Sequence, residues 1–124
     1  MIKRQQNPNW RERLIACLSG RRFSLRVEDK LQEGMAQVML LDDIPFIREY
    51  DLGDAGRIDF FVEGVGVEAK VKGGFSDVAR QLQRYAGAPD IKELLLCTSC
   101  PSHSHLPSSI SGKPLHLIKL WKAL

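Results

Sequence analysis

The sequence predicts a mixed α/β fold in which helices flank a central sheet. Apolar residues recur at helical spacing in residues 10–19, 27–42 and 75–87. Apolar and polar residues alternate in 58–63 and 65–72, and an apolar run in 93–98 is typical of a buried strand. The predicted order is α, α, β, β, β, α, β, β. Two hairpins at the centre of this order exclude an all-parallel sheet.

The elements follow from local signals. Gly20 ends the first helix, and Gly87-Ala88-Pro89 closes the third. Pro45 starts an extended segment at 46–50, and residues 53–56 form a turn. Residues 99–113 are predicted to be a loop, and a last strand is expected from 115 up to Trp121.

The chain of 124 residues fits a single domain, with a basic N-terminal helical extension at 1–26 and a core at 27–121. Charge is uneven: +6 in residues 1–26, −8 in 27–68 and +5 in 69–124. Basic surfaces suit a polyanion such as nucleic acid, and an acidic pocket suits divalent cations. An ordinary solvated surface is the alternative. The odd cysteine count, the missing signal peptide and the lack of a long apolar stretch predict a cytoplasmic protein.

The hairpin formed by 58–63 and 65–72 brings three charged residues together. Glu68 and Lys70 are two residues apart and share one strand face. With Gly64-Val65 as the turn, Asp59 lies opposite Lys70. If the turn lies one residue earlier, the pairing changes. All three residues still share one face whenever the numbers of two paired residues add up to an odd number. Ile58, Phe60, Val67, Ala69 and Val71 form the opposite, core-facing side.

Two carboxylates at short range repel each other unless a cation lies between them. Mg²⁺ prefers oxygen ligands, lowers the pKa of a bound water and polarises a phosphate. A neighbouring lysine can orient that water or neutralise charge developing on phosphorus. The competing interpretation is a solvated hairpin face with an ion pair between Lys70 and one of the acids.

These residues and a downstream helix resemble a known family. The segments Arg57-Ile58-Asp59, Gly66-Val67-Glu68-Ala69-Lys70-Val71 and Gln81-Leu82-Gln83-Arg84-Tyr85-Ala86 are similar to the PD-(D/E)xK nuclease superfamily. The Gln-x-x-x-Tyr helix resembles the branch that includes RecB-type and phage exonuclease domains. The likeness covers roughly residues 27–121 and implies a restriction-endonuclease-like core, αβββαβ, with a mixed central sheet. Ile58 stands where the superfamily's name has proline.

The resemblance implies roles for individual residues. Asp59 and Glu68 would bind Mg²⁺ or Mn²⁺ with the help of the Ala69 carbonyl, and Lys70 would be the catalytic lysine. Gln81 and Tyr85 would contact DNA or buttress the site. Many members add a glutamate from the first core helix. Helix phase favours Glu28 over Glu33, and Glu49 is the second choice.

Other features each allow two interpretations. Arg80, Arg84 and Lys72 could meet DNA phosphates or be solvated. Trp10 and Trp121 could stack on bases, although such residues more often cover a core edge. The segment Cys97-x-x-Cys100-x-x-His103-x-His105 contains half a zinc site. Its ligands are crowded into one short stretch, which favours buried or loop thiols over structural zinc.

The sequence therefore predicts a metal-dependent deoxyribonuclease of a bacterial or phage-infected cell. Recombination, repair or phage DNA processing is the expected setting. With no additional DNA-reading domain in 124 residues, selectivity would come from DNA structure (junctions, flaps or ends), from a partner or from a homodimer. The alternative is a catalytically inactive nucleic-acid-binding or assembly module with the same fold.

Overall fold

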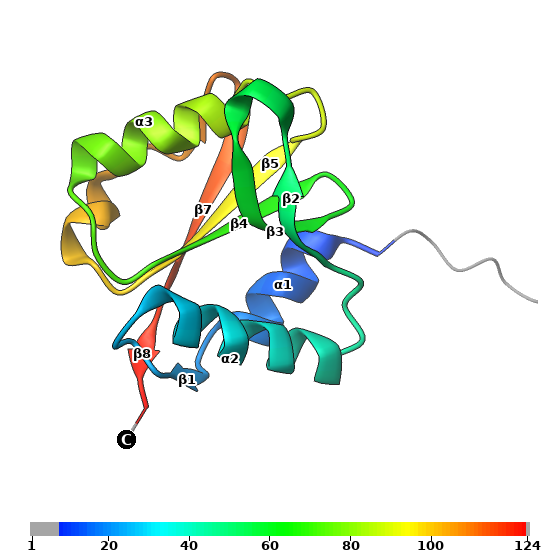
Figure 1. The fold of residues 1–124 in the computed structure, drawn as a ribbon, viewed down its shortest axis with the longest axis vertical. Helices are drawn as coiled ribbons and strands as arrows, with labels where there is room; N and C mark the ends of the chain where they lie inside the picture. The colour runs from blue at the N-terminus through cyan, green and yellow to red at the C-terminus, as the bar shows by residue number, and fades with distance from the viewer. Residues whose placement is uncertain (1–7, 124) are drawn as a thin grey trace, which may run out of the picture.

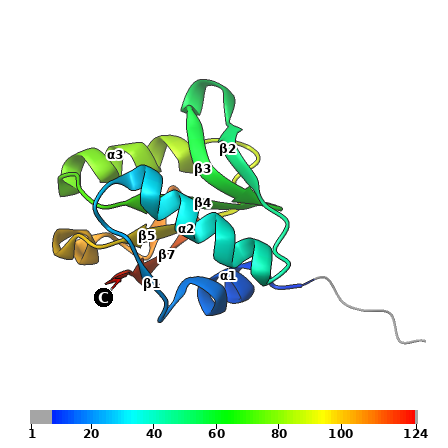
Figure 2. The same cartoon turned by 60° about the horizontal axis from the view of Figure 1, so that its bottom comes forward.

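The computed structural model describes residues 8–123 and has three layers. A mixed sheet lies in the middle, with α3 on one face and α1 and α2 on the other (Figures 1 and 2). This arrangement confirms the predicted mixed α/β class. The predicted basic extension is described only from residue 8 onwards.

Three α-helices occur within residues 8–123, and all three were expected from the apolar spacing. They are α1 (Trp10–Leu18), α2 (Glu28–Leu41) and α3 (Phe75–Ala86). The side chain of Asn9 caps α1 by accepting from the Glu12 amide at 3.1 Å, which satisfies one unpaired donor of the first turn. None of the helices in this part of the chain is long and apolar enough to cross a membrane.

The described residues form a six-stranded sheet in the order β2-β3-β4-β5-β7-β6. Its strands are β2 (Ile47–Asp51), β3 (Arg57–Val62), β4 (Val65–Lys70), β5 (Glu93–Thr98), β6 (Ser109–Ile110) and β7 (Lys113–Lys119). The β4, β5 and β7 strands are parallel, whereas β2–β3, β3–β4 and β6–β7 are antiparallel. Short 3-10 turns, η1 (Gly53–Ala55) and η2 (Pro101–His105), precede β3 and follow β5.

The sequence patterns missed three short strands. β1 (Arg22–Phe23) and β8 (Trp121–Lys122) pair in parallel as a separate small sheet. β6 lies inside the segment predicted to be a loop. The predicted last strand was also too long, because β7 ends at Lys119 and Trp121 belongs to β8. A strand of two residues is too short to show an alternating sequence pattern. Only its pairing with a partner strand defines it.

Both faces of the sheet are buried. One core lies under α1 and α2 and includes Leu14, Met35, Phe60, Val67 and Ala69, with Val71 packed against it. The other lies under α3 and contains Val78, Leu82, Ile91, Leu94 and Ile58. The predicted core face is therefore correct except at Ile58, which belongs to the core under α3. The end of its side chain occupies the space that a side chain at Gly66 would fill.

The β3–β4 hairpin turns one residue earlier than the Gly64-Val65 turn. Glu63 and Gly64 are the turn residues, with φ values of 42° and 94°, the positive values that a tight type I′ hairpin turn needs. Val62 pairs with Val65 and Phe60 with Val67. Of the two turn positions that the sequence left open, the earlier one is therefore observed, and this register places Asp59 opposite Glu68 and not opposite Lys70.

Gly66 is the position where the packing is least tolerant. A Cβ there would lie 2.5 Å from Ile58 Cδ1 and 2.8 Å from Ile91 Cδ1, and both isoleucines are fully buried. We expect Gly66→Ala to lower the free energy of unfolding by about 1–3 kcal/mol through overpacking, measured by urea denaturation. Gly87→Ala is the control, because its nearest neighbour is an ordinary contact at 3.4 Å. Equal stabilities of the two variants would contradict the expectation.

Candidate active site

Asp59 and Glu68 face each other where β3 and β4 separate. The paired register between these strands extends to Phe60 and Val67. Beyond that pair, the carboxylates of Asp59 and Glu68 accept hydrogen bonds from backbone amides of the opposite strand. The Asp59 amide donates to Glu68 Oε1 at 3.2 Å, and the Ala69 amide donates to Asp59 Oδ2 at 2.8 Å. Each acid is therefore oriented by the strand opposite it.

Burial changes how this pair ionises. Glu68 is only 2% exposed. Burial, and after it the nearby charge of Asp59, raise the pKa of Glu68 to about 8 against the opposing charge of Lys70. Burial also raises the pKa of Asp59. The two acids hold a proton more tightly than exposed carboxylates do, and a bound cation could replace that proton.

Lys70 completes this group from the end of β4. Its Nζ lies 3.5 Å from Glu68 Oε2, and its side chain is 17% exposed. The ammonium group is thus close to the acids while it remains in reach of a bound molecule. Asp59, Glu68 and Lys70 lie together as the sequence predicted, although the register differs.

Gln81 and Tyr85 join α3 to the start of β3. Gln81 Nε2 donates to the Tyr85 hydroxyl at 2.9 Å, and that hydroxyl donates to the Arg57 carbonyl at 2.8 Å. Glu68 Oε2 lies 3.4 Å from the same hydroxyl. Burial raises the pKa of Tyr85, so the hydroxyl stays protonated and able to donate. The contacts of the two side chains are those of a buttress, which was one of the two expected roles.

The candidates for an additional acid are placed differently. Glu28 is the first residue of α2, and its charge is near enough to raise the pKa of Asp59. Glu33 is exposed and pairs with Lys30. Glu49 is exposed on β2, between residues that pair with Phe60 and Ile58, so its register position is opposite Asp59. Its φ of 50° is unusual for a residue within a strand.

The oxygen atoms of this site suit a hard divalent cation such as Mg²⁺. Within residues 8–123, no three His, Cys, Asp or Glu side chains lie close enough to share a metal. Asp59 and Glu68 therefore form a two-carboxylate site, with the Ala69 carbonyl adjacent in the chain. Glu28 is near the pair without joining it. Waters and a phosphate oxygen commonly complete the coordination of Mg²⁺ at such sites.

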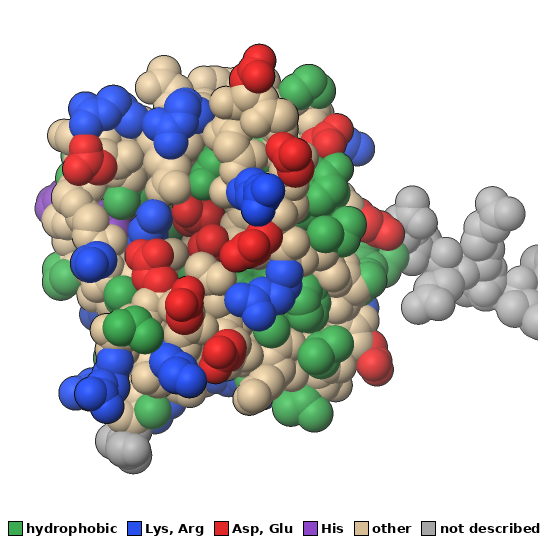
Figure 3. Space-filling view, viewed as in Figure 1, with side chains coloured by type: hydrophobic (Ala, Val, Ile, Leu, Met, Phe, Trp, Pro, Cys, Tyr) green, Lys and Arg blue, Asp and Glu red, His purple; other side chains and the backbone are tan. Residues whose placement is uncertain are grey.

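The surface around the site is mixed in charge. Figure 3 shows acidic side chains in the middle of one face, between α2 and α3, with lysine and arginine side chains around them. Lys72 and Arg84 are exposed. Arg80 is exposed as well, and it forms an ion pair with Asp77 one turn earlier on α3. An anionic ligand would meet a positive rim around a negative centre.

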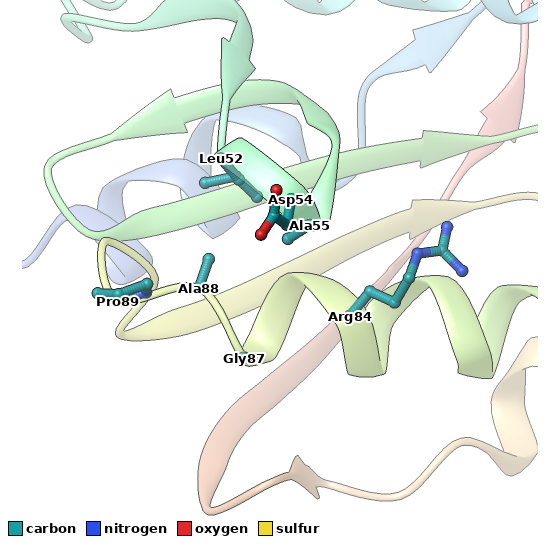
Figure 4. Close-up of a pocket in the computed structure, with 7 residues that line it drawn as sticks. All are labelled: Leu52, Asp54, Ala55, Arg84, Gly87, Ala88 and Pro89. Atoms are coloured by element: carbon teal, nitrogen blue, oxygen red, sulfur yellow. The ribbon is translucent and has the colours of Figure 1, made fainter.

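An open hollow of about 490 Å³ lies between η1 and the residues at the end of α3. It is lined by residues of η1 and the end of α3, namely Leu52, Asp54, Ala55, Arg84, Gly87, Ala88 and Pro89 (Figure 4). Arg84 precedes Tyr85 in α3, and η1 leads directly into β3. The lining of the hollow does not include Asp59, Glu68 or Lys70.

Within the described part of the chain, the cysteine and histidine segment does not bring three potential metal ligands together. Cys97 is buried within β5, Cys100 is half-buried, and His105 is exposed. His103 is fully buried. The interpretation as buried or loop thiols fits this arrangement.

The two tryptophans differ. Trp10 packs against the core under α1 and donates to Glu63 Oε2 at 2.7 Å, as expected of a residue at a core edge. Trp121 is 47% exposed, with Lys119 Nζ located 4.9 Å from its ring centre.

Sequence reasoning missed two groups beside the site. The Arg57 carbonyl is the acceptor for Tyr85, and a backbone acceptor has no sequence signal. Thr98 pairs with Lys70 across the parallel β4–β5 ladder. Its position at the end of an apolar strand could have been noticed, but which strand lies next to it could not.

Comparisons with protein-family models, with curated proteins and with solved structures each found no match. The geometry of the site and the sequence pattern therefore carry the functional argument.

The raised pKa of Glu68 predicts how stability depends on pH. The folded state binds the proton more tightly than the unfolded chain, so stability should fall as pH rises from about 4.5 to about 8. We expect Glu68→Gln to reduce this fall to the share that Asp59 contributes and to stabilise the protein at pH 8 by on the order of 3 kcal/mol. Urea denaturation at several pH values measures it.

Glu33→Gln is the matched control, because Glu33 is an exposed acid on α2. It should keep the pH profile of the wild type. Mg²⁺ should raise the melting temperature of the wild type at pH 8 and have a smaller effect on Glu68→Gln. Parallel pH profiles for the wild type and Glu68→Gln would contradict the assignment.

Proposed function

We propose that this protein is a Mg²⁺- or Mn²⁺-dependent deoxyribonuclease with a restriction-endonuclease-like core. The observation that carries the proposal is the pair of half-buried Asp59 and buried Glu68, with Lys70 Nζ located 3.5 Å from Glu68 Oε2. A buried pair of like charges is costly to the fold. Its presence at a place where two strands separate supports a role in binding a cation.

The donor set fits a hard metal ion, because it consists of two carboxylates and a neighbouring carbonyl. Asp59, Glu68 and the Ala69 carbonyl would hold the ion. When bound, such an ion polarises a phosphate and makes water acidic enough to attack at neutral pH. Amide donation from the opposite strand orients both carboxylates, and this orientation is what a second layer of contacts supplies at known metal sites.

Lys70 would act on the reacting groups. In the hydrolysis of a phosphodiester, a water oxygen bonds to phosphorus, one P–O ester bond breaks, and the departing oxygen takes a proton. The Lys70 ammonium can hold the attacking water in position or neutralise the negative charge that develops on phosphorus. Its contact with Glu68 keeps it beside the acids.

The rim around the site supports DNA as the substrate. Lys72 follows the catalytic strand, and Arg84 extends from α3 beside the hollow in Figure 4. Both are exposed cations on elements that carry the site, so they would meet backbone phosphates on either side of the scissile bond. Arg80 would contribute less, because Asp77 already neutralises it. Contacts of this kind favour selection by DNA structure over selection by base sequence.

The alternative function is a non-catalytic module of the same fold that binds nucleic acid or assembles with a partner. The retention of both carboxylates and Lys70 argues for catalysis, since binding alone needs no buried acidic pair. The two functions differ in whether DNA is cut.

The loss of Lys70 provides the test. We expect the wild type to cut plasmid or single-stranded circular DNA with Mg²⁺ and to be inactive with EDTA. Lys70→Ala should lower kcat by about 10²–10³-fold while the Kd for DNA changes little. Gel assays measure cleavage, and fluorescence anisotropy with Ca²⁺ measures binding.

Lys72→Ala is the matched control. It removes an exposed lysine two residues away, so it should weaken DNA binding modestly and leave kcat unchanged. Cleavage that persists in Lys70→Ala or in EDTA would argue against the proposed mechanism. DNA binding by the wild type with no cutting would favour the non-catalytic module.

A further inference from the structure

His103 forms a buried hydrogen-bond chain that the proposed chemistry does not use. The residue is 0% exposed. Its Nδ1 lies 2.6 Å from the Thr98 hydroxyl, and its Nε2 lies 2.8 Å from the Gly73 carbonyl. The Cys100 amide donates to the same Thr98 hydroxyl oxygen at 3.0 Å. The chain thus connects η2, the end of β5 and the loop that follows Lys70.

Counting donors and acceptors fixes the direction of this chain. A carbonyl oxygen can only accept, so His103 Nε2 must carry the hydrogen that it donates to Gly73. In a neutral ring Nδ1 is then an acceptor, and the Thr98 hydroxyl donates to it. The Thr98 oxygen accepts from Cys100 in turn. Both ring nitrogens have partners in this arrangement, and the hydrogen on Nε2 is the one that the Gly73 contact requires.

The location of the chain links it to Lys70. Thr98 is the register partner of Lys70 in the β4–β5 ladder, and the Ser99 amide donates to the Lys70 carbonyl at 3.2 Å. Gly73 lies three residues after Lys70, and its φ of 118° is a conformation that other residues rarely adopt. The backbone is therefore held at Lys70 itself and again at the loop that leads to α3.

We infer that Thr98 and His103 position Lys70 by fixing the loop of residues 71–74, so that His103 is a positioning residue; this inference rests on the proposed nuclease function. A lysine side chain is long and flexible, and its placement depends on the backbone that carries it. Residues 72–74 are exposed and include two glycines, so this loop has few side-chain contacts to hold its shape. The His103 contact supplies that constraint.

The same accounting explains why the cysteine and histidine segment does not need a metal. Both His103 nitrogens already have partners, and a metal ligand would have to give one up. Cys97 is buried within β5, under α1 and α2. The residues that resemble half a zinc site therefore serve the loop beside Lys70 in this inference.

Thr98→Val tests the inference, because it removes the hydroxyl and nearly keeps the side-chain volume. We expect kcat for DNA cleavage to fall about 10- to 100-fold while KM is unchanged. Hydrogen exchange of the amides in residues 71–74 should become faster. Thr98→Ser keeps the hydroxyl and should behave like the wild type. Nitrogen NMR of the His103 ring should show the hydrogen on Nε2 in the wild type.

Two controls separate positioning from simple loss of stability. His105→Ala alters an exposed histidine of the same turn and should change neither measurement. Leu106→Ala removes a buried side chain that makes none of these side-chain hydrogen bonds, so it serves as a destabilised reference. An equal fall of kcat in Leu106→Ala would overturn the inference, and so would a Thr98→Val variant with the kcat of the wild type.

Failure of the proposed function would appear separately. If the wild type does not cut DNA, the nuclease proposal and the catalytic part of this inference both fail. The NMR and hydrogen-exchange measurements need no DNA, so they still decide whether the chain fixes the loop. The absence of a hydrogen on Nε2, or unchanged exchange in Thr98→Val, would overturn the inference even if the wild type is an active nuclease.

Discussion

The site depends on the exchange of hydrogen bonds where β3 and β4 separate. Asp59 and Glu68 accept from amides of the opposite strand, in place of the carbonyls that an intact ladder would offer. The backbone donors stay satisfied, as buried amides require. Two carboxylates are thereby held side by side, Glu68 buried and Asp59 half-buried, where acids would not be placed without partners. Everything else that was assigned to the site lies around this pair.

The remaining structure holds that opening in place from both sides. On one side, Tyr85 of α3 bonds to the Arg57 carbonyl, two residues before Asp59. On the other, α2 begins at Glu28, close enough for its charge to affect Asp59. The parallel neighbour β5 fixes Lys70 through Thr98 and the residues that follow. A flexible pair of acids would bind a metal more weakly, because ordering the two side chains would cost part of the binding free energy.

Much of this arrangement was predictable because strands and helices have fixed periods. Alternation in β3 and β4 put Asp59, Glu68 and Lys70 on one face for both turn positions considered. The grouping of these three residues was therefore predicted correctly although the register was left open. Helix spacing likewise paired Gln81 with Tyr85. The sequence left the turn open between two positions, and the one at Glu63 and Gly64 was the second choice because a glutamate with positive φ is uncommon. Ile58 was misplaced because alternation does not indicate that Gly66 leaves space above it.

The sequence by itself determined the mixed α/β class, the three helices and the shared face of the charged residues, because these depend on local spacing. The tertiary structure decided which groups from distant segments meet. It brought the Arg57 carbonyl to Tyr85 and Gly73 to His103, and it put Thr98 beside Lys70 in the sheet. It also decided how deeply the two acids are buried, and hence that their pKa values are raised. Burial and long-range pairing arise from the packing of whole layers, and no short window of sequence contains them.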